Sequence, residues 1–218
     1  MEVRKTWCEE DHLRHFLYES VYSVLSKIEW QNRRYDVLDF GSKWFGDPDG
    51  GWQTYMRWMF KDLLGKDNLN HILGTYPEYD AENLHKLNTG SLDVLIADQV
   101  LEHVQRPWLA SEEFHRVLKP GGIAIIATPG LYPFHPSPLD CWRIMPHGYS
   151  VLFPDSHWNT LVFDTWGSAD RIAYEYSNNK ELIKGGRTYT VSEAMQQPHY
   201  NESDGLCPLQ LWWVGVKK

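Results

Sequence analysis

Two segments of the chain carry apolar residues at the spacing of an amphipathic helix. In residues 13–28 the apolar positions are Leu13, Phe16, Leu17, Val21, Val24, Leu25 and Ile28. In residues 52–63 they are Trp52, Tyr55, Met56, Met59, Phe60 and Leu63. Positions three or four residues apart lie on one side of a helix. The pattern therefore predicts two helices, each with one face packed on a core.

Six short runs predict strands, two of which, at residues 35–40 and 123–128, have the character of buried strands. They span residues 35–40, 71–75, 92–97, 123–128, 158–166 and 209–216. Between the third and fourth runs, Pro107 opens a further helix that ends at residues 119–122, since proline is favoured at the first helical position. The sequence of residues 81–87 predicts another short helix. Residues 129–146 hold five prolines and predict a long loop.

Strands that alternate with helices predict a single α/β domain whose sheet is mainly parallel, with helices on both faces. In such sheets, ligands bind beyond the carboxyl ends of the strands. The loop at Gly41, the turn at Asp98 and the loop 129–146 all follow strand ends. We therefore expect these three segments to meet at one edge of the sheet.

The length of 218 residues suits one domain with one core. We divide it into an N-terminal helical segment (1–34), a core (35–166), a polar, irregular insertion or lid (168–207) and a last strand (208–218). The polar stretch has no periodic pattern, which favours a lid over a packed element.

The net charge of −8 and the pI near 5.6 count against a nucleic-acid partner, because a phosphate backbone selects a basic surface. No run of about 18 apolar residues predicts a membrane span. The N-terminus lacks the apolar core of a signal peptide. Cys8, Cys141 and Cys207 are scattered and odd in number, which favours reduced thiols in a cytoplasmic protein. Nothing in the sequence indicates the oligomeric state.

Three segments resemble a known family. They are residues 37–42 (VLDFGS), residues 93–104 (DVLIADQVLEHV) and residues 115–122 (HRVLKPGG). In this order and spacing they are similar to the class I, Rossmann-like methyltransferases that use S-adenosylmethionine. The resemblance covers about residues 35–166. It implies the same fold, S-adenosyl-L-methionine as cofactor and methyl transfer as the activity.

The resemblance also implies which residues contact the cofactor. They are Asp39, Gly41, Ser42, Gly46, Tyr76, Glu78, Asp80, Ala81, Asp98 and Gln99. Two departures stand out. The glycine-rich loop lacks its middle glycine, and Tyr76 occupies the place of the acid that holds the ribose, so Glu78 is the substitute if the loop bends back. Asp80 matches the acid that meets the adenine amino group.

The proline-rich loop is the expected acceptor-binding segment. Its candidate residues are Tyr132, His135, Asp140, Trp142, Arg143 and His147. Prolines stiffen the loop and so hold side chains in place at a lower entropic cost. The imidazole of His135 titrates near neutrality and is the first candidate for a general base, with His103 as the second.

Arg143 has two possible roles. It could anchor a carboxylate or phosphate of the acceptor, or form a salt bridge with Asp140 that pins the loop. The spacing of His135, Asp140 and His147 matches no recognised metal motif, so no metal is expected.

The predicted function is methyl transfer to an oxygen or nitrogen of a small molecule or glycan. The alternative is a non-catalytic or repurposed member that serves as a binding or partner subunit, which the altered glycine loop and the missing ribose acid favour. The fold alone does not decide between them.

Overall fold

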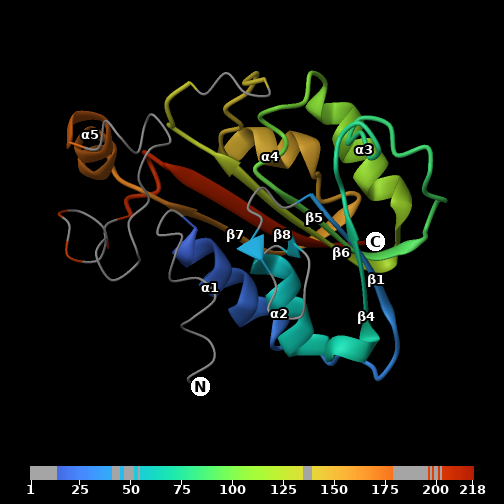
Figure 1. Cartoon of the computed structure of the whole chain (residues 1–218). Helices are drawn as coiled ribbons and strands as arrows, with labels where there is room; N and C mark the ends of the chain where they lie inside the picture. The colour runs from blue at the N-terminus through green and yellow to red at the C-terminus, as the bar shows by residue number, and fades with distance from the viewer. Residues whose placement is uncertain are drawn as a thin grey trace.

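The computed structural model describes residues 14–40, 45–46, 52–53, 55–134, 139–178, 196, 198, 201 and 203–218. Its centre is a six-stranded sheet in the order β4-β1-β5-β6-β8-β7 (Figure 1). The strands are β1 (Tyr35–Asp39), β4 (Leu69–Leu73), β5 (Leu92–Asp98), β6 (Leu118–Pro129), β7 (Trp158–Trp166) and β8 (Gln210–Lys217). All six strands predicted from the apolar runs are therefore confirmed.

Strands β4, β1, β5 and β6 run parallel to one another, and β8 is antiparallel to both β6 and β7. The prediction of a mainly parallel sheet is confirmed, with β8 as the reversed strand. The outermost strands in this order are β4 and β7. Strand β6 begins inside the segment predicted to end the preceding helix, and Gly121 there adopts φ +76°, which favours glycine.

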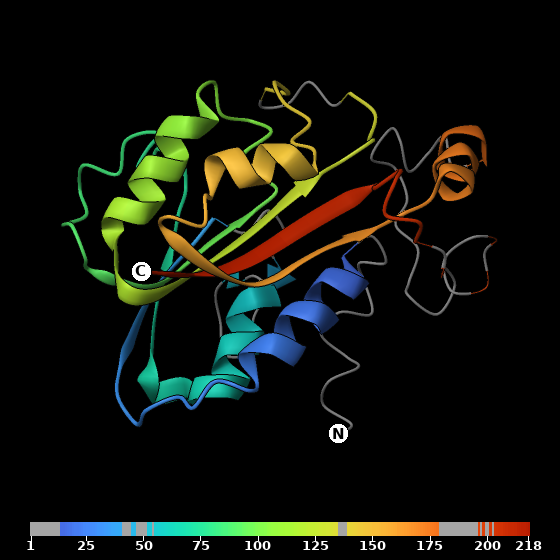
Figure 2. The same cartoon turned by 180° about the vertical axis from the view of Figure 1, so that it is seen from behind.

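Helices cover both faces of the sheet, as the two opposite views show (Figures 1 and 2). One face carries α1 (His15–Leu25) and α2 (Tyr55–Leu64), and the other carries α3 (Pro107–Val117) and α4 (Pro146–Leu152). Alternate strand residues point to opposite faces. Val37, for example, joins the core below α1 and α2, and Leu38 joins the core below α3 and α4.

The remaining elements are small or lie at the margin. A two-stranded sheet joins β2 (Phe45–Gly46) to β3 (Trp52–Gln53), and a 3-10 helix, η2, spans Lys66–Asn68. Helix α5 (Ala169–Asn178) lies beyond the end of the sheet, next to the end of β7 (Figure 1). No helix in the described part of the chain is both long and apolar enough to cross a membrane.

Two predictions about helices were wrong, and one helix was not predicted. Residues 81–87 form turns, in which the N–H of Leu87 reaches the carbonyl of Leu84, three residues back, and side chains of α3 bind further backbone groups of both residues. Helix α4 begins at Pro146, where the predicted loop ends, in a stretch for which the sequence predicted no element. Helix α5 occupies the start of the segment predicted to be irregular.

Candidate functional site

Two carboxylates lie at the carboxyl ends of neighbouring central strands. Asp39 is the last residue of β1 and pairs in register with Ile96 of β5. Asp98, the last residue of β5, therefore lies one step further along the same face. Asp39 has no exposed surface, and Asp98 is 2% exposed. Two buried acids at the ligand-binding edge of a parallel sheet mark a candidate site.

The carboxylate of Asp39 is bound by a histidine of the adjacent strand. Nε2 of His71, on β4, lies 2.9 Å from Oδ2 of Asp39, and both side chains are buried. Nδ1 of His71 has no hydrogen-bond partner in the part of the chain that the structure describes. The pair fixes the orientation of Asp39. Sequence reasoning missed His71, because it looks like an ordinary strand residue.

The carboxylate of Asp98 is reached by helix α1. The hydroxyl of Tyr18 donates to Oδ2 of Asp98 at 3.1 Å, and Nε of Arg14 lies 3.3 Å from Oδ1. The N-terminal helix therefore contributes to the site. Contacts across 80 residues of sequence leave no local pattern, so the sequence analysis did not find them.

The residue after Asp98 adopts an unusual backbone conformation. Gln99 has φ +59°, in the left-handed region that non-glycine residues rarely occupy. Its N–H donates to the carbonyl of Ala127 at 2.9 Å, which holds this turn against β6. Such conformations cluster at functional sites because the surrounding structure must stabilise them. The predicted contact of Gln99 with the cofactor stays a prediction.

Glu102 lies deeper in the same turn and is 1% exposed. Neither of its carboxylate oxygens has a hydrogen-bond partner among the described residues. Nε2 of His103 is 3.7 Å from Oε1, beyond hydrogen-bonding distance. Burial, assisted by the negative charge of Asp98, raises the pKa of Glu102 to about 8. The sequence analysis did not select Glu102, because its burial follows from packing of distant segments.

The proline-rich loop packs across this turn. The N–H of Cys141 donates to the carbonyl of Glu102 at 2.7 Å, and the indole N–H of Trp142 donates to the carbonyl of Val104 at 3.0 Å. Nδ1 of His103 is hydrogen-bonded to the carbonyl of Leu139. A carbonyl only accepts, so Nδ1 carries the proton and Nε2 of the neutral ring faces Glu102.

All five N–H groups of Arg143 are used inside this loop. Nε donates to the carbonyl of Tyr132 at 3.1 Å, Nη1 to that of Trp142 at 2.9 Å and Nη2 to that of Pro133 at 3.0 Å. The other two bind both oxygens of Asp140, one of them at 2.6 Å. These bonds to Asp140 raise the pKa of Arg143. Of the two roles left open by the sequence, this geometry supports the loop-pinning salt bridge.

The other acceptor candidates lie apart from one another. Tyr132 is partly buried against the core, and His147 is exposed in the first turn of α4. Trp142 is 38% exposed and meets Trp108 edge to face, with ring centroids 6.2 Å apart. His135 lies outside the described residues. Their roles in acceptor binding stay predictions.

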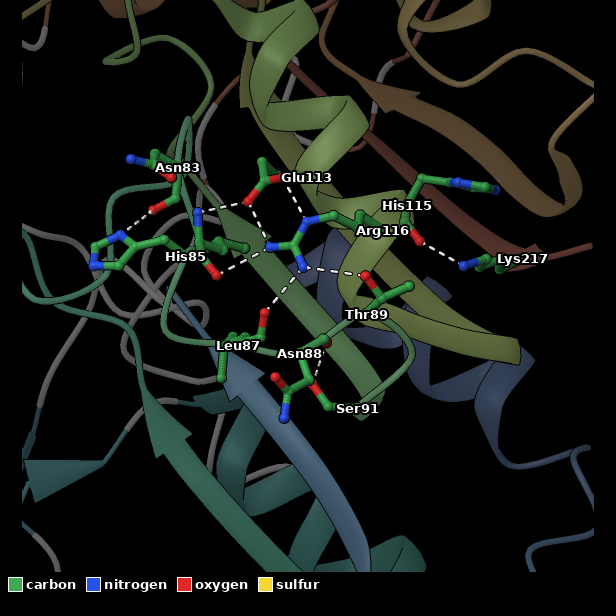
Figure 3. A network of polar contacts seen from close by, with 11 residues as sticks. Asn83, His85, Leu87, Asn88, Thr89, Ser91, Glu113, His115, Arg116 and Lys217 are labelled. Atoms are coloured by element: carbon green, nitrogen blue, oxygen red, sulfur yellow. Dashed lines mark hydrogen bonds and ion pairs between the residues drawn. The ribbon is translucent and has the colours of Figure 1, made fainter.

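A polar network holds the segment that carries Asp80 and Ala81. The carboxylate of Glu113 accepts from the N–H of Leu84 at 2.7 Å and pairs with Arg116 (Figure 3). Arg116 also donates to the carbonyls of Leu84 and Leu87 at 3.0 and 2.9 Å. Within this segment Oδ1 of Asp80 accepts from the N–H of Glu82, and Ala81 is 5% exposed. Helix α3 thus fixes the predicted adenine side of the site.

The residues predicted for the ribose are exposed. Tyr76 is 81% exposed, and the carboxylate of Glu78 lies 3.5 Å from Nζ of Lys86 with its side chain 62% exposed. Gly41 and Ser42 lie outside the described residues. Gly46 belongs to β2, where its backbone pairs with Trp52. Contacts of these residues with a cofactor stay predictions.

The described residues contain no group of three or more His, Cys, Asp or Glu side chains arranged to hold a metal ion. Asp140, one member of the only metal set that the sequence suggested, is bound to Arg143. Cys141 and Cys207 are free thiols. Cys8 lies outside the described residues.

Comparison with known proteins gives two kinds of likeness. The methyltransferase domain family model matches residues 54–126, about a third of the chain. An uncharacterized methyltransferase of Mycolicibacterium gilvum is 46% identical over 46 residues, and one of Mycobacteroides abscessus is 45% identical over 49. These matches span 21% and 22% of this chain, but only 18% and 19% of the relatives.

Two solved structures match nearly the whole chain. One is the methyltransferase component from the complex with the Haloferax volcanii Trm112 methyltransferase activator, with a TM-score of 0.54, 18% identity and coverage of 94% of this chain and 91% of that one. The other is a SAM-dependent methyltransferase from Archaeoglobus fulgidus, with a TM-score of 0.50, 15% identity and coverage of 94% and 99%. Together with the sheet order, these likenesses show that the chain has the Rossmann-like fold of these two methyltransferase structures, and that its residues 54–126 match the methyltransferase domain family model.

Proposed function

We propose that this protein is an S-adenosylmethionine-dependent methyltransferase that acts on an oxygen or nitrogen of a small molecule or sugar. The observation that carries the proposal is the group of buried acids at the carboxyl ends of β1 and β5, namely Asp39, Asp98 and Glu102. Buried acids are costly to the fold unless they are compensated, and the contacts of Asp39 with His71 and of Asp98 with Tyr18 and Arg14 hold these two at the edge where a ligand binds.

The residues present fit this cofactor. Its amine and sulfonium are positive, and the buried carboxylates of Asp39 and Asp98 provide complementary charge. By the resemblance, Asp39 and the Gly41 loop hold the methionine part, and Asp80 with Ala81 holds the adenine. When bound, the cofactor supplies a methyl group that is already activated toward nucleophiles.

The chain itself orients the acceptor, excludes water and removes a proton. The loop that Arg143 pins lies over the turn at Glu102, so it closes one side of the site. Alignment of two reactants accounts for a large part of catalysis in such transfers. His135 is the proposed general base. His103, whose Nε2 carries no proton in the neutral ring, is the second candidate.

Calorimetric titration with S-adenosylmethionine and S-adenosylhomocysteine tests the cofactor. Micromolar binding by the wild type, weakened about tenfold or more in Asp39→Ala, is the expected result, since a charged hydrogen bond is lost. His135→Ala should lower turnover about a hundredfold to ten-thousandfold with unchanged cofactor affinity. Full turnover in that variant would remove His135 from the mechanism.

A binding or partner subunit is the second candidate. Two observations favour it: the family match begins at residue 54, after the glycine loop, and the exposed Tyr76 replaces the ribose acid. The similar Haloferax volcanii methyltransferase is in a complex with an activator, so a partner would also suit this chain. Absence of cofactor binding at millimolar concentration would favour this candidate over the first.

A further inference from the structure

Three polar atoms of one short turn are buried without a hydrogen-bond partner in the described part of the chain. They are Nε2 of Gln99 and both carboxylate oxygens of Glu102. Roughly nine-tenths or more of buried polar groups in folded proteins are paired, so three unpaired atoms within four residues need an explanation. The amide nitrogen is a donor and the carboxylate an acceptor, so one ligand could satisfy both.

The polar groups that face Glu102 are already engaged elsewhere. Arg14, on α1, and Asp98, on β5, pair with each other, and the donors of Arg143 are used within its loop. From α4, the hydroxyl of Tyr149 meets Oγ1 of Thr128 at 2.9 Å. His103 lies 3.7 Å away. The described residues therefore place the charges of Arg14 and Arg143 near Glu102, but no other described residue gives its carboxylate a hydrogen bond.

We propose that Gln99 and Glu102 form the site that binds the acceptor's reacting group, a hydroxyl or an amine, and that the Glu102 carboxylate, in place of His135 or His103, accepts its proton. This inference rests on the proposed function. The acceptor's heteroatom accepts from the amide of Gln99 and donates to Glu102. The backbone of Gln99, in its left-handed conformation, turns the chain at this point.

The transfer then balances as follows. The heteroatom forms a bond to the methyl carbon, the carbon–sulfur bond of the donor breaks, and its electron pair stays on sulfur. The proton lost by the acceptor passes to Glu102, which becomes the neutral acid. Burial of that acid makes it a better proton acceptor than an exposed glutamate, because its neutral form is favoured there.

Dicyclohexylcarbodiimide tests whether a small molecule reaches Glu102. A protonated carboxyl adds across this reagent, its proton moves to nitrogen, and the acyl group shifts to give a stable N-acylurea. Near neutral pH, Glu102 should react faster than the exposed Glu112, the control on α3, and labelling should fall as pH rises through about 8. Peptide mass spectrometry locates the adduct. A Glu102 that is labelled only after denaturation would overturn the proposal.

Phenol and toluene test the class of ligand, because they share a size and differ in one hydroxyl. Phenol should protect Glu102 from labelling at about tenfold lower concentration than toluene, the factor for one ordinary hydrogen bond. Equal protection would mean that the site does not recognise a hydroxyl, and would overturn the proposed ligand class.

Titration with S-adenosylhomocysteine separates this inference from the proposed function. Wild type and Glu102→Gln should bind it equally, since the cofactor contacts assigned above do not include Glu102. Loss of binding in both proteins would reject the proposed function, whatever the labelling shows. Binding by both, together with a Glu102 that does not react, would reject only the acceptor site.

Discussion

A buried acid lies near each end of strand β5, and the two acids differ in the hydrogen bonds that they receive. Asp93, near its start, is 6% exposed and receives hydrogen bonds from Arg33 at 2.8 Å, Lys119 at 2.9 Å and the N–H of Asp36 at 2.9 Å. Glu102, in the turn after its end, is 1% exposed and receives none from the described residues. Burial raises the pKa of both acids, but at Asp93 the three donors outweigh it and lower the pKa.

The difference separates an acid that supports the fold from one that does not. At Asp93 the charge is desolvated and then fully compensated, so the group ties β1, β5 and β6 together at the amino end of the sheet. At Glu102 the charges of Arg14 and Arg143 offset burial only in part, so the pKa stays raised. Uncompensated groups at the carboxyl end agree with the edge where ligands bind in this architecture.

The largest effect should come from Glu102→Gln at alkaline pH. The pKa of Glu102 is raised to about 8 from an ordinary 4.5, so the folded state favours the protonated form. The free energy of unfolding that Glu102 contributes through its neutral form is therefore fully present below about pH 4.5. This contribution is lost as pH rises through about 8. The variant lacks this loss and should be more stable by up to about 5 kcal/mol at high pH. Urea unfolding across this range measures it, with Glu112→Gln as a control that shows no trend.

Asp93→Ala should destabilise the protein by about 2–4 kcal/mol, because it leaves Arg33 and Lys119 without their shared partner. The lowered pKa of Asp93 gives the opposite pH dependence: its contribution is present above the ordinary pKa of 3.8 and is lost as pH falls through the lowered value. Denaturant midpoints provide the measurement. Asp36→Ala is the control and should cost less than about 1 kcal/mol.

Arg143→Lys tests a side chain at the carboxyl end of the sheet whose N–H groups all have acceptors. Lysine cannot reproduce the five bonds of the guanidinium, so the unfolding free energy should fall by about 1–3 kcal/mol, and the cofactor affinity should not change. Asp140→Asn should give a similar loss. If both variants melt like the wild type while the acceptor's KM rises, Arg143 binds the acceptor and does not stabilise the loop.

Arg116→Gln tests the network on α3 and should cost about 1–2 kcal/mol, because the carbonyls of Leu84 and Leu87 lose their donor. Affinity for S-adenosylhomocysteine should fall as well, since this network holds the segment of Asp80. Arg106→Gln is the matched control. It pairs with Glu82 through a side chain that is 58% exposed and should cost under about 1 kcal/mol.

The smallest effect should come from Glu78→Ala, with less than about 0.5 kcal/mol of stability lost, because its pair with Lys86 is exposed. Its cofactor affinity should stay near the wild-type value, in contrast to Asp39→Ala. A larger affinity loss in the Glu78 variant than in the Asp39 variant would show that Glu78 holds the ribose. Calorimetry with S-adenosylhomocysteine compares the two.

Local pattern was enough to predict the sheet and three of its helices. The central strands β1, β5, β6 and β8 are largely apolar because burial on both faces of a sheet requires such runs, whereas the edge strands β4 and β7 also carry polar residues. The helix expected at residues 81–87 failed because Glu113 and Arg116, some thirty residues away, hold the backbone of this segment in turns. Helix α4 buries Tyr149 as its one fully buried residue, so it shows little periodicity.

The site was predictable where it follows strand ends and not where it depends on distant partners. Asp39 and Asp98 could be placed because each ends a strand. The contacts of Asp98 with Arg14 and Tyr18, and of Asp39 with His71, join segments that only the folded chain brings together. Glu102 was not selected for the same reason. Its lack of hydrogen-bond partners depends on which groups its neighbours bind in the folded chain.

The reversed strand β8 imposes an order of assembly on the sheet. It pairs with β6 from Ile123 to Pro129 and with β7 from Trp158 to Trp166, and β7 pairs with no other strand of the main sheet. β7 therefore cannot enter the sheet by its own pairing with β6. It joins the main sheet only through β8, whose pairing with β6 closes a loop of 80 residues between Pro129 and Gln210, and such long-range closure is slow. An intermediate formed by the parallel strands alone would expose the edge of β6. Another chain could pair with this edge, so aggregation would begin there.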